Sequence, residues 1–232
     1  MTAFLTAGPD NAKTTLMLAP GAGASMTSAW MNRMSDLLAE AGLRVVRFDF
    51  DYMTERQETG SRRPPPKAEK LVAEYEVAVS EVGGSGRLLI GGKSLGGRVA
   101  SMAAQSLFDK GRIAGLVCLG YPFHPPDKPD QLRTKHLIDI TCPTLILQGE
   151  RDPFGVPSEV EGYGLSPSIA VHWLTDGDHD LVPRRSSGAT TKANMAEAVA
   201  AIVRFVSCVE RRDRSVDRWV CGCWRGARPT SG

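Results

Sequence analysis

Short apolar runs alternate along this chain with longer segments whose apolar residues recur every three or four positions. The runs are typical of strands and cover 14–19, 44–50, 87–92, 114–120, 144–149 and 168–174. Several are apolar on both sides, as strands buried inside a parallel sheet are. The alternation predicts an α/β fold with a mostly parallel central sheet of about six or seven strands and helices on both faces.

Helical periodicity follows several of these runs. Residues 30–41 carry apolar side chains at helical spacing, with Ser28 placed as an N-cap and Gly42 as a stop. A second helix is predicted to start at Ser94, and a last one, around 195–206, should lie on the sheet.

Proline-rich and charged stretches predict two loops. The stretch 54–70 holds three consecutive prolines and leads into a helix predicted over 68–82, and the second loop covers 121–137. The second loop is too short to be a lid domain. We therefore predict one domain over residues 1–209, without a lid, and a disordered tail over 210–232.

Composition and charge exclude several function classes. Hydrophobic residues make up 42% and charged residues 23%, which is ordinary for a globular protein. The net charge is +2, but residues 210–232 hold six arginines against three acidic residues, which leaves −1 for residues 1–209. The body lacks the basic surface that nucleic acid requires and has no run near 18 apolar residues. We expect neither a nucleic-acid nor a membrane partner.

Cysteines and the first residues predict a cytoplasmic protein. The five cysteines are an odd number at irregular spacing, and Cys118 and Cys142 lie in apolar runs, which indicates buried thiols. Residues 1–13 show no signal-peptide pattern. Cys221 and Cys223 form a C-x-C pair, which alone is a weak metal signal.

The stretch GGKSLGG (91–97) fits two chemistries. GKS ends a phosphate-binding loop, but that motif needs a glycine five positions before Gly92, where this chain has Arg87. The intervening residues also form a predicted strand, which cannot wrap a phosphate. G-x-S-x-G is instead a nucleophile elbow, in which Gly92 and Gly96 leave room around a strained serine. We predict Ser94 as the nucleophile, at the end of a strand and the start of a helix.

A serine nucleophile needs a base and an acid that orients the base. Asp152 follows one predicted strand and His179 follows the next, so both lie on loops at the carboxyl edge of the sheet, and we predict them as acid and base. Alternatives remain: Glu150 could replace Asp152 if its loop is shifted. His172 is expected to be a packed or edge residue of its strand, and His124 and His136 are expected at the surface or at the rim of a pocket. Asp176, Asp178 and Asp180 could hydrogen-bond His179 locally, but side chains so close in sequence are expected to cap a turn.

Two backbone amides should hold the oxyanion, each contributing about 3 kcal/mol in the transition state. We expect one from Leu95, directly after the nucleophile, and one from Ala22 in the glycine-rich turn after the first parallel strand. Around the site, Lys93, Arg62 and Arg63 form a candidate basic, substrate-binding mouth, with Arg98 nearby, that would favour acidic substrates.

Together the motifs APGAGASM, RPPPK, GGKSLGG, GYPFHPPDKP, LQGERDPFG and GDHDLVPR resemble the dienelactone-hydrolase-like branch of the α/β-hydrolases. The similarity is greatest to its small lidless group, which includes a testis-expressed protein and a scaffold subunit of a histone acetyltransferase complex. It runs from about residue 12 to about 207 and implies the α/β-hydrolase fold and the triad Ser94, Asp152 and His179. Dienelactone hydrolases proper carry a cysteine where this chain has Ser94.

The sequence thus predicts a serine hydrolase that cleaves small carboxylic esters or thioesters through an acyl-enzyme, without metal or cofactor. The alternative is a non-catalytic protein-interaction module with the same fold, since a fold does not determine a function.

Overall fold

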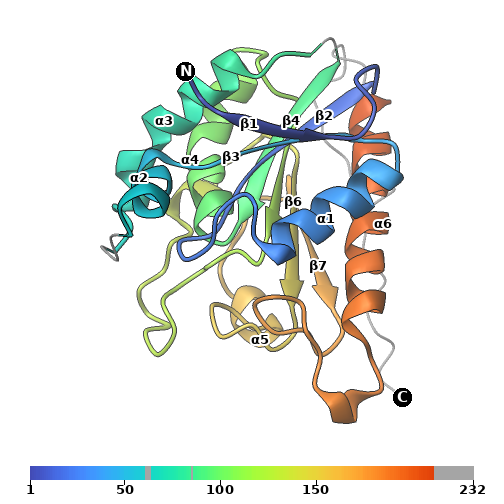
Figure 1. Cartoon of the computed structure of the whole chain (residues 1–232). Coiled ribbons are helices and arrows are strands. Elements are labelled where there is room, and N and C mark those ends of the chain that lie inside the picture. The colour runs from blue at the N-terminus through green and yellow to red at the C-terminus, as the bar shows by residue number, and fades with distance from the viewer. Residues whose placement is uncertain (61–63, 85, 212–232) are drawn as a thin grey trace.

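A sheet of seven strands forms the centre of the computed structural model, which describes residues 1–60, 64–84 and 86–211 (Figure 1). The strands are β1 (Phe4–Ala7), β2 (Thr14–Ala19), β3 (Arg44–Phe48), β4 (Arg87–Lys93), β5 (Gly115–Leu119), β6 (Thr144–Gly149) and β7 (Ile169–Leu174). Their order is β1-β3-β2-β4-β5-β6-β7, and each neighbouring pair is parallel except β1 with β3. The predicted mostly parallel sheet is confirmed.

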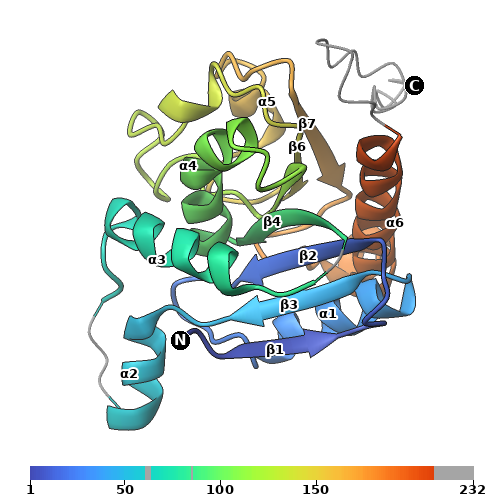
Figure 2. The ribbon, with the colours of Figure 1, turned by 90° about the horizontal axis from the view of Figure 1, so that it is seen from above.

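Helices cover both faces of this sheet (Figure 2). They are α1 (Ala29–Glu40), α2 (Asp51–Thr59), α3 (Ala68–Glu81), α4 (Leu95–Asp109), α5 (Pro157–Val160) and α6 (Thr191–Glu210), with 3₁₀ turns at Lys135–Leu137 and Arg185–Ser187. The buried side chains of α3 and α4 pack into one apolar cluster, and those of α1 and α6 pack into another. The two clusters lie on opposite faces of the sheet.

Strand β2 shows why the apolar runs are buried on both sides. Met17 and Ala19 belong to the cluster with α3 and α4, whereas Leu16 and Leu18 belong to the cluster with α1 and α6. Successive side chains of a strand point to opposite faces, so a strand between two helical layers must be apolar throughout. The predicted strand bounds match those of β2 and β6 at both ends.

Two elements differ from the prediction. Helix α2 occupies the first part of the stretch that we expected to be a loop (54–70), and β1 was not expected at all. In α2 only Met53 is buried, so no apolar stripe marks the helix in the sequence. The helix consists mostly of good helix formers and ends at Gly60, whose φ of 69° is left-handed. Strand β1 is short and half-exposed, and it is stabilised by its antiparallel pairing with β3.

The predictions for the C-terminal segment can be compared only in part. Helix α6 ends at Glu210, one residue beyond the expected boundary of the domain. The expected disordered tail and the pair Cys221 and Cys223 lie outside the described residues, except for positions 210 and 211. Within the described ranges, no helix has both the length and the apolar character needed to cross a bilayer.

Candidate active site

Ser94 lies in a sharp turn between β4 and α4. Its φ of 51° and ψ of −113° are unusual for a residue other than glycine, and such strain is characteristic of a nucleophile elbow. A Cβ on Gly92 would lie 2.4 Å from the carbonyl oxygen of Ala19, and one on Gly96 would lie 2.2 Å from that same oxygen. The two glycines therefore let the turn pack directly against the end of β2, as the G-x-S-x-G interpretation requires.

The phosphate-loop alternative fails on local structure. All residues of Arg87–Lys93 belong to strand β4, which pairs with β2 on one side and with β5 on the other. Amides engaged in a sheet cannot wrap a phosphate. The prediction from spacing and the structure agree on this point.

Asp152 and His179 form a hydrogen-bonded pair. Nδ1 of His179 lies 2.8 Å from Oδ2 of Asp152; the carboxylate is fully buried, whereas the histidine side chain is 23% exposed. The other carboxylate oxygen, Oδ1, accepts a hydrogen bond of 2.9 Å from the backbone N–H of Phe154. A carboxylate bonded to Nδ1–H selects the tautomer whose Nε2 can accept a proton. The Phe154 ring also packs on the imidazole, with ring centroids 4.4 Å apart.

Several contacts bring the histidine loop against the nucleophile elbow. The backbone N–H of Ser94 donates to the carbonyl oxygen of Leu119 at 2.9 Å. A Cβ on the next residue, Gly120, would lie 3.3 Å from Cε1 of His179, so the imidazole packs over that glycine. The side chain of Lys93 donates to the backbone oxygen of His179 at 2.8 Å. The carboxyl edge of the sheet thus gathers the elbow, the acid and the base.

The two candidate oxyanion donors flank this elbow. Leu95 is the first residue of α4, where backbone N–H groups are not used inside the helix. Ala22 lies in the loop after β2, and a Cβ on its neighbour Gly21 would lie 3.5 Å from Cβ of Ser94. This loop therefore runs beside the serine.

Two charged residues that sequence reasoning did not select hold the loop of Ala22. Asp49 accepts a hydrogen bond of 2.7 Å from the backbone N–H of Met26, and Arg47 donates to the carbonyl oxygen of Met26 at 2.7 Å. Both side chains are buried, and burial raises the pKa of Asp49, against the hydrogen bonds from Met26 and Gln57. Their signal in the sequence is two charges spaced two residues apart at the end of an apolar strand, which places both on one face.

We expected Lys93 to contribute to a substrate-binding mouth, but its ammonium group contacts other residues of the protein. The side chain is only 8% exposed and contacts His179, Asp180 and Trp30 rather than extending into solvent. Arg62 and Arg63, the other residues of the predicted basic mouth, lie outside the described residues. Arg98 is half-buried and pairs with Glu69 on α3 at 2.7 Å.

The remaining histidines take structural positions. His136 is hydrogen-bonded to Ser101 at 2.8 Å, and burial, with a contribution from Arg98, lowers its pKa to about 4. His172 lies in β7 and pairs with Glu197 on α6. We expected His124 at the surface or at the rim of a pocket; the surface part is wrong, because His124 is 3% exposed and contacts Glu159.

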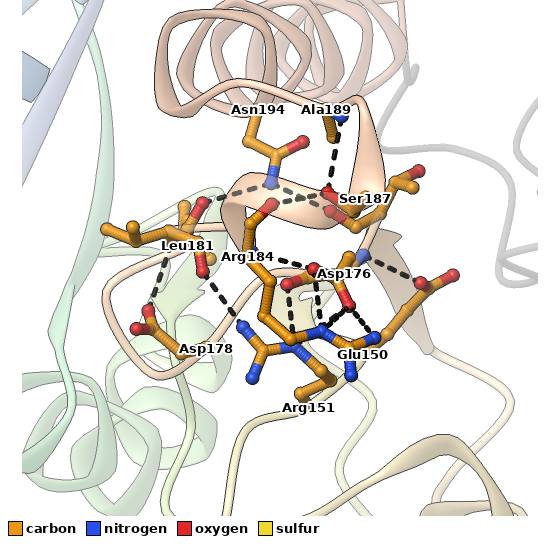
Figure 3. Close-up of polar contacts among 11 residues, drawn as sticks. Glu150, Arg151, Asp176, Asp178, Leu181, Arg184, Ser187, Ala189 and Asn194 are labelled. Atoms are coloured by element: carbon orange, nitrogen blue, oxygen red, sulfur yellow. Dashed lines mark hydrogen bonds and ion pairs between the residues drawn. The ribbon is translucent and has the colours of Figure 1, made fainter.

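The acidic residues around His179 hold its loop in place (Figure 3). Asp176 lies between Arg151 and Arg184, and the hydrogen bonds from Arg184 lower its pKa to about 2. Glu150 accepts a hydrogen bond of 2.8 Å from the backbone N–H of Asp176. Asp178 accepts bonds from the backbone N–H groups of Asp180 and Val182, as expected of a turn cap. Glu150 thus supports the loop, while Asp152 contacts the histidine.

Comparison with known proteins agrees with this class of fold. The model of the α/β-hydrolase domain family matches residues 12–207, so the chain belongs to that family. Among solved structures, a dienelactone hydrolase from Anabaena variabilis is 19% identical to this chain, with a TM-score of 0.63, and the match covers 85% of this chain and 88% of that one.

Two further structures show the same fold. Est1E from Butyrivibrio proteoclasticus is 12% identical, with a TM-score of 0.61, over 88% of this chain and 94% of that one. A serine hydrolase without a lid, from Xanthomonas campestris, is 18% identical, with a TM-score of 0.53, over 89% and 94% of the two chains. The predicted α/β-hydrolase fold is confirmed.

Proposed function

We propose that the protein is a serine hydrolase that cleaves small carboxylic esters or thioesters through an acyl-enzyme intermediate. The observation that carries this proposal is the hydrogen bond between His179 and the buried Asp152, on a loop that is bonded to Lys93, the residue before the strained Ser94. A strained serine and an imidazole oriented by a carboxylate are the groups that activate a hydroxyl for attack.

In the proposed mechanism, Oγ of Ser94 attacks the substrate carbonyl carbon while Nε2 of His179 takes its proton. Asp152 keeps the imidazole in its tautomer and stabilises the imidazolium that forms. The N–H groups of Leu95 and Ala22 hold the oxyanion of the tetrahedral intermediate. As that intermediate collapses, the leaving alcohol or thiol takes the proton from His179. Water, deprotonated by the same histidine, then attacks the acyl carbon; as the bond to Oγ breaks and the acid leaves, His179 returns the proton to Ser94.

Replacement of the nucleophile tests this proposal. We expect Ser94→Ala to abolish hydrolysis of a short-chain aryl ester and labelling by a fluorophosphonate, with an unchanged melting temperature. The matched control is Ser106→Ala, an exposed serine on α4, the helix that follows Ser94, which should retain both activities. Ester hydrolysis retained in Ser94→Ala would contradict the mechanism.

The same labelling experiment addresses the alternative. We also propose that the chain is related to the lidless group that includes a testis-expressed protein and a scaffold subunit of a histone acetyltransferase complex. A protein that acts only as a scaffold needs no activated serine. A wild-type protein that reacts with neither ester nor fluorophosphonate would favour the non-catalytic interaction module.

We further propose that this enzyme acts in the cytoplasm on a small-molecule substrate, without nucleic-acid or membrane partners. Cys118 and Cys142 are buried thiols, which suits a reducing compartment. The near-neutral charge of residues 1–209 suits a small substrate better than a polyanion. The proposed mechanism uses water and the side chains and backbone amides of the chain itself, and it needs no metal ion or cofactor.

A further inference from the structure

Lys93 directly precedes the proposed nucleophile, and its ammonium group is surrounded by protein. Nζ donates to the backbone oxygen of His179 at 2.8 Å and lies 3.2 Å from Oδ1 of Asp180. It also lies 5.5 Å from the centre of the Trp30 ring, within the range of a cation–π contact. An ammonium has three N–H groups, and these three partners match that number.

Trp30 also binds the histidine loop directly. Its indole N–H donates to the backbone oxygen of Asp180 at 3.0 Å, so α1, β4 and the loop after β7 meet at one point. We call Lys93, Trp30 and Asp180 the lysine clamp. Two successive carbonyl oxygens, those of His179 and Asp180, are fastened by its side chains. The clamp therefore holds the backbone at the base and at the next residue.

Burial of the ammonium group of Lys93 in the clamp is energetically unfavourable. The side chain of Lys93 is 8% exposed and that of Asp180 is 63% exposed, so the cation loses far more hydration than its partner. Burial lowers the pKa of Lys93, against the opposing effect of Asp180. An apolar side chain would fill the volume without this penalty. What the ammonium adds is a hydrogen bond to the backbone of the proposed base.

We propose that Lys93 is a positioning residue for His179, which it fastens to β4, the strand that ends directly before Ser94. This inference rests on the proposed function. Asp152 orients the imidazole from one side, and Lys93 holds the backbone of the same histidine from the other. Since Lys93 and Ser94 are adjacent in the chain, the base is held relative to its nucleophile, and small misplacements of such groups cost about 100-fold in rate.

The ammonium group of Lys93 also lies close to the imidazole of His179. A Cβ on Gly120 would lie 3.2 Å from Nζ of Lys93 and 3.3 Å from Cε1 of His179, so the ammonium is close to the ring. The charged groups around His179 come from β4 (Lys93), from the segment after β6 (Asp152) and from its own loop (Asp178 and Asp180). Loss of the ammonium group therefore changes the surroundings of the imidazole and also removes the hydrogen bond to the His179 backbone.

Kinetics test the positioning role. We expect Lys93→Met, which keeps length without charge, to lower kcat for a short-chain aryl ester about 10- to 100-fold, with KM changed less than about 3-fold. The control is Lys70→Met, an exposed lysine on α3, which should leave both constants unchanged. A kcat of Lys93→Met within about 3-fold of wild type would overturn the proposal.

Histidine NMR supplies a readout that needs no catalysis. The chain has four histidines, and the signal of His179 is assigned by its loss in His179→Gln. Lys93→Met should shift the ring signals of His179, whereas Lys70→Met should leave them at their wild-type positions. If the wild type proves inert toward esters and fluorophosphonate, the proposed function fails, and this experiment still decides whether Lys93 acts on His179. Ring signals of His179 that stay unchanged in Lys93→Met would overturn that inference.

A third variant covers the case in which Lys93→Met does not fold. Trp30→Phe keeps an aromatic ring near Lys93 and removes the N–H that binds the Asp180 carbonyl. We expect it to lower kcat about 3- to 10-fold at unchanged KM. Wild-type kcat in a folded Trp30→Phe protein would count against the clamp.

Discussion

Gln148 donates a hydrogen bond of 2.9 Å to Oδ2 of Asp152, the same carboxylate oxygen that accepts the bond from His179. The glutamine is fully buried, and its amide also pairs with the backbone of Tyr121, accepting from its N–H at 2.7 Å and donating to its carbonyl oxygen at 3.1 Å. The amide therefore fixes the rotation of the acid against the segment after β5. The orientation of the proposed base depends on this buried contact as well as on the acid itself.

Replacement of this amide should reduce both activity and stability. In Gln148→Met, the donor on Asp152 is lost and the backbone of Tyr121 loses its partners, which costs about 1–3 kcal/mol for each buried group left unpaired. We expect kcat to fall about 10-fold at unchanged KM. Gln105→Met is the matched control, because Gln105 also bridges two segments, far along α4 from the elbow. It should lose stability but keep kcat, as ester kinetics and urea unfolding will measure.

A methyl group at the elbow should disrupt the turn. In Gly96→Ala the new Cβ would lie 2.2 Å from the carbonyl oxygen of Ala19 and 2.6 Å from that of Pro20, and both are backbone atoms that cannot move independently. We expect a loss of about 3 kcal/mol or more in the free energy of unfolding. In Gly83→Ala nothing lies within 4 Å of the new atom, so its unfolding curve should overlay that of wild type. Equal stability of the two variants would refute this packing.

Acid should release the loop that carries His179. Hydrogen bonds from Arg184 lower the pKa of folded Asp176 from 3.8 to about 2, so this carboxylate stabilises the fold above its unfolded pKa. That contribution is lost as the pH falls from about 4 toward about 2. Asp176→Asn should therefore be less stable than wild type near neutral pH, and the difference should vanish near pH 2. Urea unfolding across this range tests it, with exposed Asp139→Asn as control. A difference independent of pH would contradict the assignment.

The loop with the proposed oxyanion donor Ala22 should depend on Asp49. In Asp49→Ala the backbone N–H of Met26 loses its acceptor, and the loop is free to shift relative to Ser94. We expect kcat for a short-chain ester to fall about 10-fold, less than the 10²- to 10³-fold that loss of an oxyanion donor causes. Asp10→Ala, in an exposed turn, should behave as wild type. If Asp49→Ala retains full kcat, the loop does not need this anchor.

The sequence by itself determined the features that depend on short segments. The apolar runs at 14–19 and 144–149 predict the first and last residues of β2 and β6 correctly, since a strand buried on both faces must be apolar throughout. The elbow is equally local, because a strained serine between strand and helix demands small residues on either side. Placing Asp152 and His179 at one edge follows from the mostly parallel sheet, because all its strands except β1 end there.

Only the tertiary structure decided which side chains meet across the sheet. Gln148 could be recognised as a support of Asp152 only once the segment after β5 was placed against β6. The partners of Lys93 lie 63 residues before it and 86 residues after it, and the sequence does not reveal whether a lysine at the end of a strand turns inward or outward. Such contacts depend on the packing of distant elements, whereas periodicity along the chain records only which side of each element is buried.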